Sequence, residues 1–170
     1  MATQQIFSLT LAVKQDGPLT VTGHQIITTG DHNINGVTVA GEKLIGTMTT
    51  MRKPAELYSW DIKTIEQKQI SHANDNLLSG FKMGNVEKRT IKTTDGEDML
   101  TWVIYPPDFD PAKKYPTLLY CQGGPQSAVS QFFSLRWNFQ LMAAKGYIVV
   151  APNRRGLPGF GQKWNDAISK

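Results

Sequence analysis

The stretch Thr117-Leu118-Leu119-Tyr120-Cys121-Gln122-Gly123-Gly124-Pro125 decides the fold of the second half of this 170-residue sequence. Residues 116–121 form an apolar run without alternation, which is typical of a strand in a sheet that is covered on both faces. Residues 131–145 then carry apolar side chains at the spacing of one helical face, and Gly146 stands where such a helix would end. Residues 147–151 predict a second buried strand. The order strand, helix, strand predicts a parallel pair with a right-handed crossover.

Two more strands are predicted just before this unit. Residues 86–93 and 99–105 are joined by Asp95-Gly96, a tight-turn signal. The proline-rich segment 106–111 cannot continue a strand ladder, so it predicts a loop. From about residue 86 onward, the chain therefore reads as an α/β fold.

Residues 1 to about 85 instead read as short strands and turns. Turns are predicted at Asp16-Gly17-Pro18, Asn35-Gly36 and Ala40-Gly41. Strands are predicted at residues 7–13, 37–39, 43–50, 56–62 and 68–71. In residues 7–13 apolar and polar side chains alternate, the period of a half-buried strand. This spacing is typical of a sandwich or a propeller, and we favour an incomplete propeller over another antiparallel sheet.

The segment Gln122-Gly123-Gly124-Pro125 is the candidate for chemistry. It lies between a predicted strand and a predicted helix, and its glycines allow a sharp turn and a close approach of ligand atoms to backbone amides. In α/β-hydrolases, this loop supplies one N–H of the oxyanion hole, and the residue after the nucleophile supplies another. Alone, Gly-Gly-Pro is a common turn. Its position in the order of elements favours the oxyanion role.

Composition excludes several classes of protein. Hydrophobic residues make up 40% and charged residues 19%, as in a globular chain, and no apolar run reaches the roughly 20 residues that a membrane span needs. The net charge of +4 is scattered in short basic pairs, which disfavours a nucleic-acid surface. No signal peptide is visible, and the compartment stays open between periplasm and cytoplasm. The one cysteine, Cys121, is predicted to be a buried structural residue, since no activating base is adjacent in sequence.

The second half resembles the start of the catalytic domain of the prolyl oligopeptidase family of serine peptidases. The resemblance rests on residues 118–125, Arg136-Trp137, residues 146–156 and Gly159-Phe160-Gly161, and it is greatest to the bacterial dipeptidyl-peptidase and acylaminoacyl-peptidase branch. Residues 92–107 resemble that family's passage from propeller to hydrolase domain, and residues 56–72 resemble its last propeller blades.

The resemblance implies a division of the chain and a function. Residues 1–85 would be the last blades of an incomplete β-propeller, and residues 86–170 the N-terminal part of an α/β-hydrolase domain. The family cleaves short peptides with a Ser–Asp–His triad, and it implies no metal or organic cofactor. Gln122, Gly123 and Gly124 match its oxyanion loop, although Gln122 stands where branches have tyrosine or histidine. The sequence does not decide whether the complete protein forms a homodimer.

The sequence contains no complete triad. An α/β-hydrolase serine lies in Gly-x-Ser-x-Gly, and none of the serines here has a glycine two positions before it. No histidine follows His72, although the triad histidine comes last in this fold. We therefore expect the catalytic residues beyond Lys170, and expect these residues alone to be inactive and to need the rest of the hydrolase domain for folding. An esterase of the same fold and a noncatalytic interaction protein are the alternatives.

The remaining candidates have structural interpretations. The glycine-rich residues 156–161 do not match a nucleotide-binding motif, and Arg154 and Arg155 are predicted to form structural ion pairs or lie on the surface. The histidines match no standard metal spacing: His24, His32 and His72. The tryptophans are predicted to be packing residues: Trp60, Trp102, Trp137 and Trp164.

Overall fold

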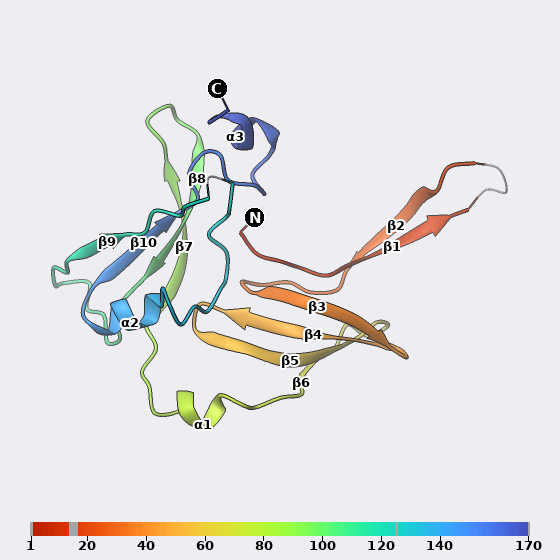
Figure 1. Cartoon of the computed structure of the whole chain (residues 1–170), viewed down its shortest axis with the longest axis horizontal. Helices are drawn as coiled ribbons and strands as arrows, with labels where there is room; N and C mark the ends of the chain where they lie inside the picture. Colours follow the sequence, from red (N-terminus) through yellow and green to blue (C-terminus); the bar gives the residue numbers. More distant parts are fainter. Residues whose placement is uncertain (1, 14–16, 125, 170) are drawn as a thin grey trace.

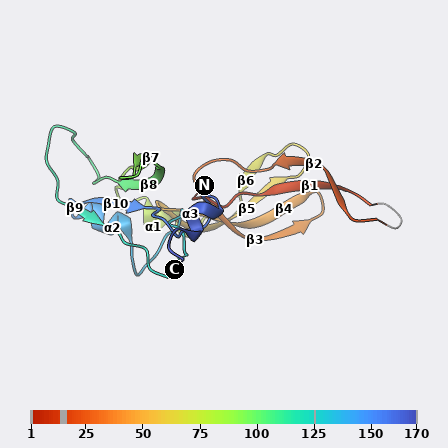
Figure 2. The same cartoon turned by 90° about the horizontal axis from the view of Figure 1, so that it is seen from above.

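The computed structural model describes residues 2–13, 17–124 and 126–169. Within these residues the strands form three sheets, drawn as separate groups in Figure 1. The chain runs from a two-stranded ribbon through an antiparallel meander to a mixed sheet, and the molecule is elongated (Figure 2). None of the helices in the described part of the chain is long and apolar enough to cross a membrane.

The ribbon pairs β1 (Phe7–Ala12) with β2 (Thr20–Ile26) and projects away from the other sheets (Figure 1). The predicted strand at 7–13 is confirmed, but its predicted half-burial is wrong. Its apolar side chains stay exposed, with fractions of 52% at Phe7, 60% at Leu9 and 49% at Leu11. The cause is the projection of the ribbon, which leaves its apolar side without a second layer in the described residues. Asp16 of the predicted turn lies outside these residues.

The meander contains β3 (Asn33–Ala40), β4 (Lys43–Thr50), β5 (Lys53–Asp61) and β6 (Gln67–Gln69), in that spatial order. Every neighbouring pair is antiparallel, and a small core of Ile27, Ile34, Tyr58 and Trp60 lies against it. The four predicted strands in this region are confirmed: the strand predicted at 43–50 coincides with β4, and the other three have shifted ends.

The two predicted turns of the meander have different outcomes. Ala40-Gly41 forms the β3–β4 hairpin, with φ of +62° at Gly41. The predicted turn at Asn35-Gly36 is wrong, because both residues lie inside β3. There the pairing shifts between Asn35 and Thr38, and Gly36 has φ of +60°. The glycine therefore serves a β-bulge, which uses the same left-handed backbone as a turn.

The carboxylate of Glu56 ties the meander to the segment that leaves it. Glu56 lies on β5 with 2% of its surface exposed. Its oxygens accept hydrogen bonds from the Ser71 hydroxyl, the Ala73 N–H (3.3 Å) and both the N–H (2.9 Å) and the side-chain amide (2.8 Å) of Asn74. Because these donors favour the charged form, led by Ser71, they lower the pKa of Glu56 to about 2.

Replacing Glu56 with glutamine tests this tie. An amide places a donor against the Ala73 N–H, so we expect Glu56→Gln to lower the melting temperature of the full-length protein. A carboxyl pKa of about 2 in the folded protein, against 4.5 ordinarily, gives stability that is present above about pH 4.5 and lost as the pH falls toward 2. The difference in melting temperature between wild type and Glu56→Gln should therefore be constant above pH 5 and shrink below pH 4.5. A difference that does not change with pH would contradict this role.

The mixed sheet follows α1 (Asp75–Leu78) and contains β7 (Val86–Lys92), β8 (Asp98–Ile104), β9 (Thr117–Leu119) and β10 (Ile148–Pro152). Its order is β7-β8-β10-β9, with β9 parallel to β10 and the other pairs antiparallel. The predicted turn at Asp95-Gly96 is confirmed, with φ of +85° at Gly96. The predicted parallel pair with its intervening helix is also confirmed.

The helix predicted at 131–145 is shorter than expected. It is α2 (Phe139–Ala144), because the side chain of Asn138 accepts a hydrogen bond from the Leu141 N–H (3.0 Å) and caps the first turn. Before it, the side-chain oxygen of Gln131 accepts from the Met51 N–H in the β4–β5 turn (3.0 Å). That contact and Met51 itself, packed in the core beside Trp102 and Ile104, hold the meander against the mixed sheet.

The predicted burial of residues 116–121 is wrong. Only Thr117–Leu119 form a strand, and Leu118 and Leu119 keep exposed fractions of 37% and 64%. Cys121, predicted to be buried, is exposed as well. The reason is the sheet order, which places β9 at the edge with no strand beyond it among the described residues.

Candidate functional site

The candidate loop begins where β9 ends. β9 runs parallel to β10, and the Tyr120 N–H donates to the Val150 carbonyl (2.8 Å), which extends the pairing by one residue. Parallel strands bring their carboxyl ends to the same edge of a sheet, and that edge is where ligands bind in open α/β sheets. The loop after β9 and the turn after β10 therefore meet. α3 (Gln162–Asp166) follows that turn.

The three residues predicted for the oxyanion loop lie at this edge. Gly123 and Gly124 are exposed, and Gly124 has φ of +62°, a conformation that side-chain-bearing residues rarely adopt. A Cβ atom placed on either glycine would meet no heavy atom within 4 Å. The loop thus leaves open space beside the backbone of both glycines. Pro125 lies outside the described residues.

Gln122 is held from two directions. The Tyr120 hydroxyl donates to its side-chain oxygen (2.7 Å), and Nη2 of Arg154 donates to its backbone carbonyl (3.2 Å). The side-chain oxygen of Gln122 is therefore engaged as an acceptor within its own loop, and the peptide that joins Gln122 to Gly123 is fixed by an arginine after β10.

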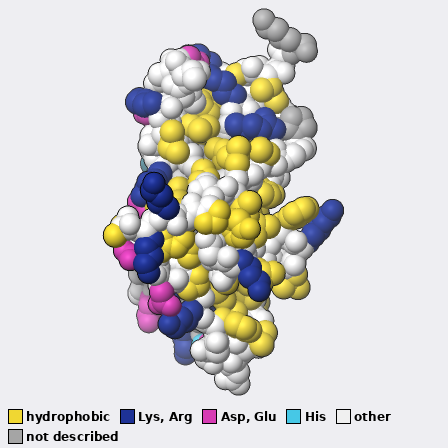
Figure 3. Space-filling model, turned by 90° about the vertical axis from the view of Figure 1, so that its left-hand side faces the viewer, with side chains coloured by type: hydrophobic (Ala, Val, Ile, Leu, Met, Phe, Trp, Pro, Cys, Tyr) yellow, Lys and Arg dark blue, Asp and Glu magenta, His cyan; other side chains and the backbone are white. Residues whose placement is uncertain are grey.

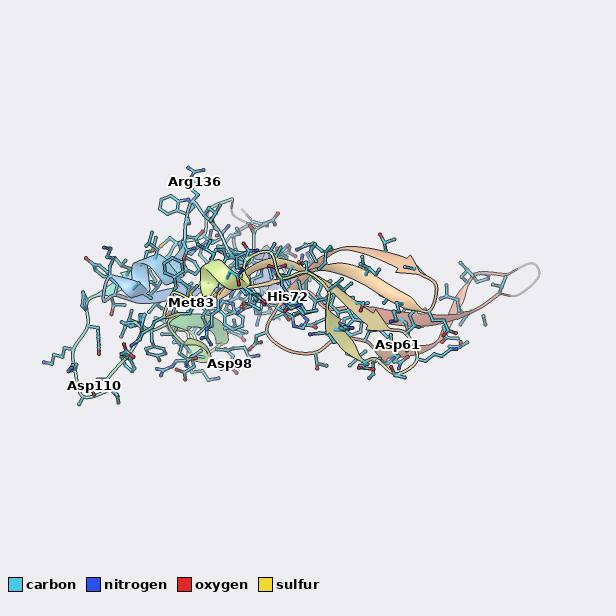
Figure 4. The ribbon with its side chains drawn as sticks, turned by 90° about the horizontal axis from the view of Figure 1, so that it is seen from below. Asp61, His72, Met83, Asp98, Asp110 and Arg136 are labelled. Carbon is cyan, nitrogen blue, oxygen red and sulfur yellow. The ribbon has the colours of Figure 1, made fainter. Side chains whose placement is uncertain are left out.

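A cavity of about 400 Å³ lies beside the loop, between the β9–β10 pair and α2. Gly123, Cys121, Leu119 and Trp137 line it. Trp137 is 50% exposed, so its predicted role as a packing residue is wrong, whereas Trp60, Trp102 and Trp164 are buried as predicted. Hydrophobic side chains are spread over this side of the molecule (Figure 3), and the guanidinium of Arg136, labelled in Figure 4, lies 5.7 Å from the centre of the Trp137 ring.

A larger cavity, of about 760 Å³, lies between α2 and the segment around α1. Leu77, Phe81, Leu135 and Leu141 give it an apolar lining, and Met83 also borders it, close to α1 in Figure 4. Gly123 and Gly124 are not among the residues that line it. We place the candidate site at the smaller cavity because that one adjoins the loop amides.

Asn153, just after β10, is a residue that the sequence analysis did not single out. It is fully buried, and its side chain makes two hydrogen bonds to the backbone of Val129: it accepts from the N–H (2.9 Å) and donates to the carbonyl (3.1 Å). Val129 lies at the far end of the segment that starts with Gln122. The only sequence signal is an amide residue directly after a buried strand.

Arg154 and Arg155 differ in their contacts. Arg155 forms an ion pair with Asp95 and lies 4.9 Å from the centre of the Trp164 ring. The hydrogen bond from the Arg155 guanidinium favours the charged carboxylate and lowers the pKa of Asp95 to about 2. The predicted structural ion pair is confirmed for Arg155, but Arg154 instead donates to the carbonyls of Gln122 and Arg155.

The histidines and the glycine-rich loop at 156–161 make contacts within the fold. His72 pairs with Asp75 (2.6 Å), and burial lowers the pKa of His32. In residues 2–13, 17–124 and 126–169, no three His, Cys, Asp or Glu side chains gather as metal ligands. In the loop at 156–161, Leu157 is fully buried, and the Gly156 N–H donates to the Trp164 carbonyl (2.8 Å).

Comparison with known proteins identifies the family of this chain. The profile of the prolyl oligopeptidase family matches residues 133–170. Dipeptidyl-peptidase 5 of Porphyromonas gingivalis is 50% identical over 143 residues, which are 84% of this chain and 21% of that protein. The chain belongs to the prolyl oligopeptidase family. A second member, the probable dipeptidyl-peptidase 5 of Aspergillus terreus, is 54% identical over 120 residues, 65% of this chain and 16% of the relative.

Solved structures of prolyl oligopeptidase family peptidases share the fold. The Pyrococcus horikoshii acylaminoacyl peptidase superposes with a TM-score of 0.74 at 30% identity, over 88% of this chain and 23% of that one. The chain spans about a fifth of the length of its curated bacterial relatives. The fold that this chain shares with part of these peptidases has mostly antiparallel sheets and one parallel strand pair.

Proposed function

We propose that this chain is part of a serine peptidase that hydrolyses short peptides through an acyl-enzyme. Residues 1–85 would be blades of its propeller, and residues 86–170 the start of its α/β-hydrolase domain. Three observations support the division: an antiparallel meander in the first part, a parallel strand pair in the second, and the family match confined to residues 133–170.

The observation that carries the function is the open glycine loop at the carboxyl end of β9. When a serine attacks a peptide carbonyl, negative charge develops on the oxygen, and backbone N–H donors fixed nearby stabilise it. Gly123 and Gly124 would present such a donor, and the residue after the nucleophile would present the other. Losing one such donor lowers kcat by about 10²–10³-fold.

The nucleophile, acid and base would come from sequence beyond Lys170, because no serine here lies in Gly-x-Ser-x-Gly. Residues 1–170 alone would then be inactive. The curated relatives are named dipeptidyl peptidases, and a structural relative is an acylaminoacyl peptidase. We therefore propose short peptides as the substrate class, with removal of dipeptides or of acylated residues as the two specificities.

The test uses the full-length reading frame that contains these residues. Purified protein is assayed with dipeptidyl-p-nitroanilides, acylaminoacyl-p-nitroanilides and short-chain p-nitrophenyl esters, each with and without a fluorophosphonate. We expect amide turnover that the fluorophosphonate abolishes, and the better amide assigns the specificity. Turnover of esters alone would favour an esterase. No turnover of any substrate would reject the enzyme and favour an interaction protein.

A further inference from the structure

The loop after β9 has few means to hold its own shape. Gly123 and Gly124 have no side chains to pack, and glycine is the residue that loses most conformational freedom on ordering. Since a donor must be fixed before the transition state forms, a loop of this kind depends on anchors at its ends.

Two consecutive residues after β10, Asn153 and Arg154, supply an anchor at each end of the loop. The fully buried side chain of Asn153 makes two hydrogen bonds, of 2.9 and 3.1 Å, to the backbone of Val129 at one end of the loop. The Trp102 indole N–H donates to the same Val129 carbonyl (2.9 Å). Arg154 holds the Gln122 carbonyl at the other end, at 3.2 Å from Nη2.

The position of the Arg154 contact matters because of peptide geometry. The Gln122 carbonyl and the Gly123 N–H belong to one planar trans unit and point in opposite directions. An arginine that fixes the Gln122 carbonyl therefore also fixes the direction of the Gly123 N–H. The second donor atom of the same guanidinium, Nη1, bonds to the Arg155 carbonyl (2.9 Å), which holds the arginine in place.

We propose that Arg154 is a positioning residue for the oxyanion loop, acting with Asn153 as a two-point clamp. This inference rests on the proposed function. It assigns Arg154 no contact with substrate: its effect passes through the Gln122–Gly123 peptide. Arg155 makes a suitable control, because its side chain contacts Asp95 and Trp164, whereas the Gln122 carbonyl is held by Arg154.

The test compares Arg154→Met, Arg154→Lys and Arg155→Met in the full-length protein. Methionine keeps an apolar stem without the guanidinium. We expect Arg154→Met to lower kcat about 10-fold with KM within about 2-fold, since only a transition-state contact is loosened. Its affinity for a peptide aldehyde, which forms a tetrahedral adduct, should fall in parallel. Arg154→Lys can still donate to one carbonyl and should recover part of the loss. Arg155→Met should keep kcat within about 2-fold, because the Arg155 side chain contacts Asp95 and Trp164 and does not hold the Gln122 carbonyl.

A second readout does not need activity. Limited proteolysis with proteinase K, followed by mass spectrometry, measures cleavage within residues 121–128. We expect cleavage several-fold faster in Arg154→Met than in wild type or Arg155→Met, with unchanged melting temperature. Equal cleavage and equal kcat would overturn the positioning role. If wild type hydrolyses no substrate but Arg154→Met is still cleaved faster in the loop, the clamp stands and the proposed peptidase function fails.

Discussion

Replacing Gly124 with alanine is expected to lower kcat of the full-length peptidase by roughly 10- to 100-fold, with a smaller effect on KM. Gly124 has φ of +62°, where a side chain costs about 1–2 kcal/mol. The new Cβ would meet no atom within 4 Å, so the strain comes from the positive φ and not from a clash. We expect the backbone to rotate at residue 124 to relieve that strain. That rotation turns the loop N–H away from the oxyanion. Steady-state kinetics with a peptide p-nitroanilide measures the effect.

Gly41 supplies a matched control for this substitution. It has the same φ of +62° and the same open space around its Cβ position, but it lies in the β3–β4 hairpin of the meander. Gly41→Ala should therefore cost similar stability and leave kcat unchanged. Equal kcat in Gly124→Ala and Gly41→Ala would show that the loop does not serve the transition state.

Gly84→Ala is expected to produce the largest loss of stability, roughly 3 kcal/mol or more. A Cβ on this buried glycine would stand 1.9 Å from the Tyr105 carbonyl oxygen, and backbone atoms cannot move aside as a flexible side chain can. The Gly84 N–H also donates to the side-chain oxygen of Gln140 (2.7 Å), which joins the segment before β7 to α2. We expect the melting temperature of the full-length protein to fall by several degrees in thermal denaturation.

Gly80→Ala controls for the loss of a glycine in the same segment. The nearest atom to its Cβ position is the Leu77 carbonyl oxygen at 3.8 Å, an ordinary contact. This variant should melt within a degree or two of wild type. If Gly84→Ala melts at the same temperature as Gly80→Ala, the close approach of residues 84 and 105 is absent in solution.

The features that could be predicted from the sequence are those that depend on residues close together in the chain. The strand, helix and strand around α2 follow from local periodicity, and Asp95-Gly96 forms the expected tight turn because its partners are adjacent. The placement of Gln122, Gly123 and Gly124 after a strand follows from the same local reading. Their role in an oxyanion hole stays a prediction.

Features that depend on distant residues were missed. Asn35-Gly36 suits a turn or a bulge equally, and only the register with β4 decides between them. The exposure of Leu119 and Cys121 follows from the sheet order, which periodicity does not reveal. The hydrogen bonds between Asn153 and Val129 join residues 24 positions apart, so no short motif could have indicated them.

A crystal structure of the full-length protein after fluorophosphonate labelling would show whether this loop donates to an oxyanion. We expect one modified serine, located beyond Lys170, with a phosphonyl oxygen about 2.7–3.1 Å from the backbone nitrogen of Gly123 or Gly124. A labelled serine whose phosphonyl oxygen is bound only by other donors or by solvent would contradict it.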